Sequence, residues 1–170
     1  MKKTLWFERI FPAIEDNGRF PTIVERLEGT PARLAAKMKH IDADLTLSKE
    51  GQWSIKKEIG HLIDLEPLWH ERAKQILRGD GCMQIADLTN QRTHQTDHDA
   101  QSVATLIKRF RKQRYSFIQT IQHINADDLE KAAIHPRLGT PMRLIDLAFF
   151  VAEHDDHHLA QITFLSKNNV

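Results

Sequence analysis

Hydrophobic residues recur every three or four positions along most of the chain, which is the spacing of one buried helix face. The strict alternation of a half-buried strand is missing, so no sheet is expected. We predict a short N-terminal helix at 6–14 and longer helices at about 20–40, 54–77, 102–124 and 140–166. Their number and lengths predict an all-α fold, a four-helix bundle with one long crossover connection, in a single domain over residues 1–170.

Proline and glycine residues mark the expected boundaries of these helices. Pro31, with the glycine and threonine before it, should kink or break the second helix, and Pro67 should bend the third. Gly79 should end the third helix. Thr140 followed by Pro141 has the pattern of a helix start. Residues 82–101 are polar and read as the long connection, and residues 127–133 are expected to add a turn of helix.

The chain has ten histidines, and two of them lie on the hydrophobic face of the last predicted helix. His154 and His158 are four residues apart, so their imidazoles lie one turn above the other on the same face. Burying them among leucines and isoleucines costs free energy unless each finds a partner. A divalent cation would satisfy both. The alternative is two core histidines, each bonded to a carboxylate such as Asp155 or Glu66.

A third histidine, His61, lies at the edge of the broad hydrophobic face of the third helix, among carboxylates that include Glu66. Alone, such a histidine is usually just a satisfied side chain. If the two helices face each other, however, three nitrogens converge, and three protein ligands with a vacant position are typical of a catalytic zinc site. Glu66 and Asp155 point most nearly inward, and we expect a carboxylate to orient the imidazoles or to act as a base.

These residues stand in motifs that resemble those of the DinB-like superfamily. The first motif is Trp53-Ser54, Glu58, His61-Leu62 and Glu66, and the second is the run from Ala152 to Ile162. Residues 27–34 and 135–141 also resemble one branch of the superfamily. The resemblance implies a four-helix bundle that often forms dimers and holds zinc, nickel or a similar ion through three histidines, here His61, His154 and His158. It also implies one of two kinds of activity. Members of the superfamily are thiol-dependent transferases and isomerases, which use low-molecular-weight thiols, or presumed hydrolases.

Composition and charge exclude several other classes of function. The formal net charge is +1, which gives no reason to expect binding to nucleic acid or to an anionic membrane surface. No hydrophobic run approaches the ~20 residues that span a bilayer. Glu8 and Arg9 interrupt the N-terminal hydrophobic stretch, which argues against a signal peptide and leaves a cytoplasmic location as the expectation. The single cysteine, Cys82, excludes an intrachain disulfide.

Two further polar clusters are interpreted as solvated. His94 and His98 have polar neighbours and read as part of the connection, although this loop could fold over the site. The second cluster spreads around most of a helix circumference, so a solvated face is favoured over a nucleic-acid site. Its members are Lys108, Arg109, Arg111, Lys112 and Arg114.

The resulting hypothesis is a metal-dependent enzyme that acts on a small-molecule substrate, as a thiol-dependent S-transferase or as a hydrolase. Zinc or nickel and a low-molecular-weight thiol are the expected cofactors. His98 or His135 are candidates for moving protons, but no catalytic residue is assigned. The alternative is a non-catalytic metal-binding bundle that acts through dimerisation or a protein partner. The aromatic N-terminal segment is expected to pack on the bundle or to help form a homodimer.

Overall fold

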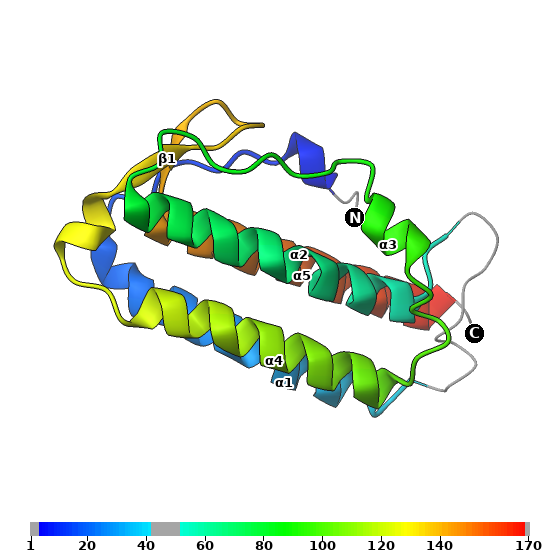
Figure 1. Cartoon of the computed structure of the whole chain (residues 1–170). Helices are drawn as coiled ribbons and strands as arrows, with labels where there is room; N and C mark the ends of the chain where they lie inside the picture. The colour runs from blue at the N-terminus through cyan, green and yellow to red at the C-terminus, as the bar shows by residue number, and fades with distance from the viewer. Residues whose placement is uncertain (1–3, 42–51, 169–170) are drawn as a thin grey trace.

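Four long helices account for most of the computed structural model, which describes residues 4–41 and 52–168 (Figure 1). They are α1 (Phe20–Met38), α2 (Ile55–Arg78), α4 (Val103–Gln122) and α5 (Leu144–Asn168). Serine hydroxyls cap two of them: Ser54 accepts from an amide of the first turn of α2, and Ser102 does the same for α4. Gly79 ends α2 with a φ of 78°, a left-handed conformation that glycine adopts without steric cost. The predicted all-α bundle is confirmed.

The four helices form a square in which α2 and α1 each pack against α4 and α5. Figure 1 shows that α1 and α5 run in one direction and that α2 and α4 run in the other. Because α2 and α4 are parallel, the chain between them has to return along the whole bundle. This segment, residues 79–102, includes the short helix α3 (Gln91–Gln95) and is the predicted crossover.

Pro31 and Pro67 lie inside α1 and α2, and both helices continue past them, so the break expected as one outcome at Pro31 is absent. The expected start of the last helix was wrong. The last helix begins at Leu144 rather than at residue 140, because Pro141–Arg143 forms strand β2, which pairs antiparallel with β1 (Ala132–Ile134). A small sheet is therefore present. Each strand has three residues, too few for alternation to be recognised in the sequence.

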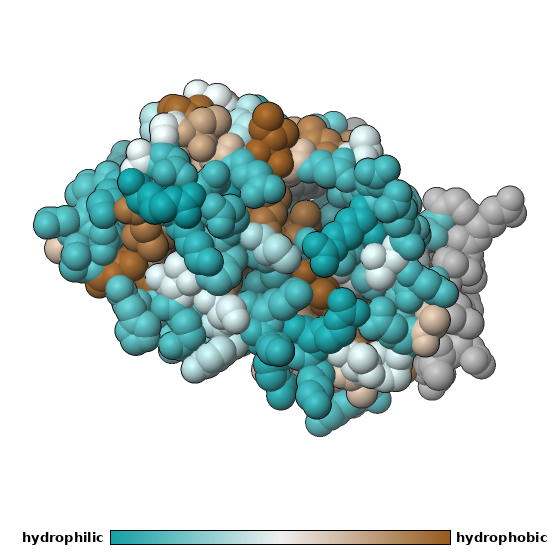
Figure 2. Space-filling model, in the orientation of Figure 1, coloured by the Kyte–Doolittle hydropathy of each residue, from teal (hydrophilic) through white to brown (hydrophobic). Residues whose placement is uncertain are grey.

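Short 3-10 turns complete the described chain. They lie at Trp6–Glu8, Asn17–Arg19 and Asp127–Glu130. The last of these confirms the helical turn predicted before β1, whereas the N-terminal segment is mainly extended rather than the predicted helix. No helix within the described ranges is long and hydrophobic enough to cross a membrane. Figure 2 shows a mostly hydrophilic face, with hydrophobic residues gathered toward the edge where the connection and the N-terminal segment lie.

A buried polar layer divides the hydrophobic core into two clusters. It takes one residue from each long helix: Thr30, Glu66, Arg114 and Asp155, each at most 2% exposed. The guanidinium of Arg114 donates to Glu66 Oε1 (3.0 Å from Nε) and to Asp155 Oδ1 (2.9 Å from Nη2), and Thr30 donates to Asp155 Oδ2 at 2.7 Å. Burial raises the pKa of Glu66, and the charge of Arg114 opposes this rise.

This layer corrects two interpretations made from the sequence. Arg114 is not part of a solvated basic face, because it is buried between two carboxylates. Glu66 and Asp155 do point inward as predicted, but they bind Arg114 rather than the imidazoles. The helix wheel placed the carboxylates correctly and could not tell which buried neighbour they would meet.

Candidate metal centre

Three histidines from two facing helices bring one ring nitrogen each into a small buried cluster. His61 comes from α2, and His154 and His158 come from consecutive turns of α5. One ligand atom of each lies within 4.8 Å of those of the other two, and the three residues are 4–7% exposed. The Nε2 atoms of His154 and His158 are 3.2 Å apart. The structure thus brings together the three residues that the sequence singled out.

The outer nitrogen of His158 is held by a carboxylate. Its Nδ1 lies 2.6 Å from Oε2 of Glu58. Glu58 lies in the first turns of α2, four residues after the N-cap Ser54. An ionised carboxylate only accepts, so Nδ1 of His158 carries the proton and Nε2 keeps its lone pair. A carboxylate behind a histidine in this way fixes the ring and raises its basicity as a metal ligand.

A chain of two hydrogen bonds likewise fixes the ring of His61 through its Nδ1 atom. Its Nδ1 lies 3.1 Å from the hydroxyl of Thr93 in α3, and that hydroxyl donates to Oδ2 of Asp64 at 3.0 Å. Because Thr93 gives its one proton to Asp64, it has to accept from His61. His98 also donates to Asp64, with Nε2 at 2.8 Å from Oδ2. The lone pair of His61 therefore faces the cluster.

The electrostatics of the cluster favour neutral imidazoles, as metal ligation requires. Burial, with the neighbouring His158 second, lowers the pKa of His61 to about 3. Burial also lowers the pKa of His154, with His158 and His61 adding to the effect. Two nitrogens bound to one tetrahedral ion at about 2.1 Å would be about 3.4 Å apart, close to the 3.2 Å seen between His154 and His158. These residues fit a divalent ion.

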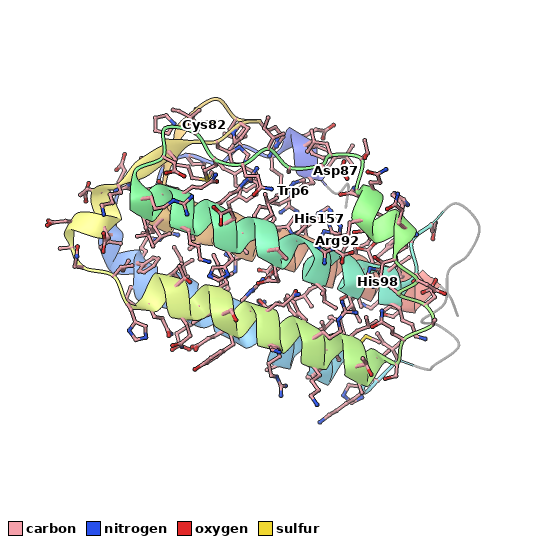
Figure 3. All side chains as sticks on the ribbon, viewed as in Figure 1. Trp6, Cys82, Asp87, Arg92, His98 and His157 are labelled. Atoms are coloured by element: carbon pink, nitrogen blue, oxygen red, sulfur yellow. The ribbon has the colours of Figure 1, made fainter. Side chains whose placement is uncertain are left out.

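His98 is buried, which corrects the sequence interpretation of a solvated loop. Its ring is 1% exposed and packs against Gly60 of α2, where an added Cβ would lie only 2.2 Å from the His98 ring. The missing side chain at residue 60 is what lets the connection approach α2 so closely, and Figure 3 shows His98 on this connection beside the helix. His94, in contrast, is exposed as expected.

A cavity of about 380 Å³ opens from the three histidines, and phenylalanine and tryptophan rings, further histidines and aliphatic side chains line it. The ring of Trp6 stands edge-on to His154, with centroids 5.0 Å apart, and also contacts Phe150. The N-terminal segment thus packs on the bundle, which was one of the two expectations for it. Figure 3 shows Trp6 and His157 together between this segment and the α2–α5 layer, with Asp87 on the connection above them.

Sequence reasoning missed several residues of this site. Glu58 belongs to the first motif, but its partner lies 100 residues away on α5 and no periodicity pairs them. Thr93 lies in a polar segment without a helical stripe, so nothing marked it as buried. Gly60 in the middle of a helix was the one available signal, because glycine there costs stability and often marks a close approach.

Comparisons with known proteins agree with this fold. A solved structure with the same fold is that of YfiT from Bacillus subtilis, described as a probable metal-dependent hydrolase with an unusual four-helix bundle topology. It superposes with a TM-score of 0.79 over 93% of each chain, at 18% sequence identity. A search of curated proteins found no match. Residues 19–162, most of the chain, match the family defined as the DinB superfamily. The chain therefore belongs to the DinB superfamily.

Proposed function

We propose that this protein holds one divalent metal ion through His61, His154 and His158 and is a metal-dependent hydrolase of a small molecule. The observation that carries the proposal is the convergence of three buried imidazole nitrogens at an aromatic cavity. The description of YfiT supports the reaction class. A divalent ion held there would supply Lewis-acid chemistry and would lower the pKa of a bound water to about 7.

The protein's own residues supply orientation and exclusion of water. Glu58 and the chain from Thr93 to Asp64 hold two imidazoles with their lone pairs inward. Within the described residues the cluster contains no fourth histidine, cysteine or carboxylate, so an open position is expected, as in catalytic rather than structural zinc sites. Trp6 covers His154 and limits the access of solvent. Imidazole ligands suit zinc and nickel equally.

Metal content provides the first test. Protein purified without an affinity tag and reconstituted with zinc or nickel should carry one ion per chain by mass spectrometry. His154→Ala should lose tight binding and remain helical, since the hydrophobic stripe of α5 is unchanged. His94→Ala is the matched control and should bind normally, because His94 is exposed outside the cavity. Equal metal content in wild type and His154→Ala would refute the site.

Turnover provides the second test. The metal-loaded protein should hydrolyse small esters such as 4-nitrophenyl acetate, and His154→Ala should not. A parallel assay with cysteine and 1-chloro-2,4-dinitrobenzene asks whether a thiol is transferred instead, which would replace the hydrolase by a thiol-dependent S-transferase. Full metal binding without turnover in either assay would favour the alternative, a non-catalytic metal-binding bundle that acts through dimerisation or a protein partner.

A further inference from the structure

Two arginines line the cavity beside the histidine cluster, and neither has an acidic partner among the residues that the structure describes. They are Arg72 on α2 and Arg137 in the turn between β1 and β2. No ion pair within the described ranges includes either guanidinium, and burial is the main influence on the pKa of both groups. The contrast with Arg114 is direct, because that equally buried arginine is held between two carboxylates.

Arg72 is 2% exposed, and its hydrogen bonds leave donors unused. Nε and Nη2 both donate to the carbonyl oxygen of Gln84, at 3.0 and 2.8 Å, and Nη1 lies 3.0 Å from Nε2 of His135. A guanidinium has five N–H groups, so two have no acceptor in these contacts. Burial, together with the charge of Arg137, lowers the pKa of Arg72 to about 10, so the group is still cationic at neutral pH.

The contact with His135 adds another unsatisfied donor. The backbone amide of Leu138 donates to Nδ1 of His135 at 3.2 Å, while Arg72 approaches Nε2 of the same ring. A neutral imidazole has only one acceptor nitrogen, so both donors cannot be satisfied together. Burial, Arg72 and Arg137 lower the pKa of His135 to about 4, so the ring is neutral at physiological pH. An acceptor from a ligand would resolve this conflict.

Arg137 faces the same space from the hairpin turn. Its guanidinium lies over the rings of Phe7 and Phe150, at 5.4 and 6.0 Å from their centroids, and its buried Nη2 has no hydrogen-bond partner in the described part of the chain. One carboxylate, Asp87, also lines the cavity. Its oxygens already accept from the backbone amides of Thr89 and Gln91, so it caps its own turn.

We propose that Arg72 and Arg137 form a binding subsite for an anionic group, a carboxylate or a phosphate, on the molecule that occupies the cavity. Both anions match the fork of a guanidinium and would accept the unused N–H groups. The aromatic lining takes the hydrophobic body of the same molecule. The inference rests on the proposed function only where it calls this molecule the substrate.

The spacing limits the size of the ligand. The ring centre of Trp69 lies 5.6 Å from that of His154 and 5.5 Å from the guanidinium carbon of Arg72, so this carbon is at most about 11 Å from the ring centre of His154. A molecule with one aromatic or short aliphatic body between its anionic group and its reacting group spans this distance. The substrate class is therefore a small, amphipathic monoanion or dianion.

Ligand binding to the metal-free protein tests the subsite separately from the metal. All three tryptophans, Trp6, Trp53 and Trp69, line the cavity, so their fluorescence reports occupancy directly. The probes are 3-phenylpropanoate, phenyl phosphate and the neutral 3-phenylpropanamide. The metal-free wild type should bind at least one anionic probe at least about tenfold more tightly than the amide, because the amide offers a neutral carbonyl oxygen in place of a charged acceptor. Added zinc should not be needed for this binding. The tighter of the two anions assigns the group as carboxylate or phosphate.

Variants identify the residues that bind the anion. Arg137→Met, at a half-buried turn position, should weaken the anionic probe about tenfold or more and leave the amide unchanged. Arg72→Lys, checked for native circular dichroism, should also weaken it, because lysine loses the fork. Arg111→Met, an exposed arginine of α4, is the control and should bind normally. Amide binding as tight as that of the anions, unchanged affinity in Arg137→Met, or anion binding that occurs only after zinc is added would each overturn the subsite.

Discussion

Replacing Arg114 by methionine should destabilise the bundle strongly, because the change leaves Glu66 and Asp155 buried without their cation. The guanidinium is 2% exposed and donates to both carboxylates and to the carbonyl oxygen of Leu27. Methionine has a similar length but none of these donors. The loss therefore affects the polar layer that takes one residue from each of the four long helices.

The size of the effect follows from this burial. Removing one partner of a buried ion pair typically costs about 3–5 kcal/mol, because the charge left behind is desolvated and unpaired. For a domain of this size, that loss lowers the melting temperature by roughly 6–20 °C. Arg111→Met on the exposed side of the same helix removes the same charge and should change stability by no more than about 0.5 kcal/mol.

The variant should also acquire a distinct pH dependence. In the native protein, burial raises the pKa of Glu66 and Arg114 lowers it. Without Arg114, burial and the charge of Asp155 remain, and both raise the pKa. The folded variant then holds a proton that the unfolded chain releases near a pKa of about 4.3. The proton bound to Glu66 stabilises the folded variant fully below a pH of about 4.3. This stabilisation is lost as the pH rises through the raised pKa of Glu66 in the folded state.

Urea unfolding at pH 5 and pH 8, followed by circular dichroism, measures both effects. The deficit of Arg114→Met relative to wild type should be larger at pH 8. A second variant, with Glu66 and Asp155 also replaced by leucine, should recover part of the lost stability, since an uncharged layer needs no cation. A deficit below about 1 kcal/mol at pH 8 would refute the reasoning, because such a value is typical of a solvent-exposed ion pair.

Two further predictions concern the surroundings of the histidine cluster. Glu58→Gln should weaken zinc binding about 10–100-fold in a competition titration with a chelator, because the outer nitrogen of His158 loses its carboxylate. Glu71→Gln, at a half-exposed position, is the control. Equal zinc affinities of the two variants would exclude this role for Glu58. Gly60→Ala should lower the free energy of unfolding by about 1–3 kcal/mol, since its Cβ would overlap the His98 ring. Gly29→Ala in α1, where the added Cβ meets nothing within 4 Å, should instead raise the free energy of unfolding by about 0.5–1 kcal/mol. If both substitutions changed the free energy of unfolding in the same direction, the close packing at Gly60 would be contradicted.

The helices and the pair His154 and His158 could be predicted because both depend on spacing within a single helix. His61 stands on another helix and was assigned to the same site from the motifs that resemble the DinB-like superfamily. The interval between His154 and His158 fixes their common face whatever surrounds them. The partners of these rings could not be predicted in the same way. Glu58 and Thr93 become partners only when α5 and the connection pack against α2, and that packing depends on tertiary contacts that no local pattern encodes. Arg114 illustrates the same limit, since a basic residue in a basic stretch is usually solvated.

The polar layer and the histidine cluster meet in one segment of α5, where consecutive side chains point to different neighbours. Asp155 binds Arg114 in the core, and Asp156 binds Arg26 on α1 at the edge of the bundle. His154, the residue before these two, lines the cavity and faces His61 on α2. Rotating α5 by one residue, about 100°, would turn His154 away from His61 and would break both ion pairs at once. The buried charges cost desolvation energy, but they fix the rotation of α5 about its axis, and this rotation is what brings the three imidazoles together.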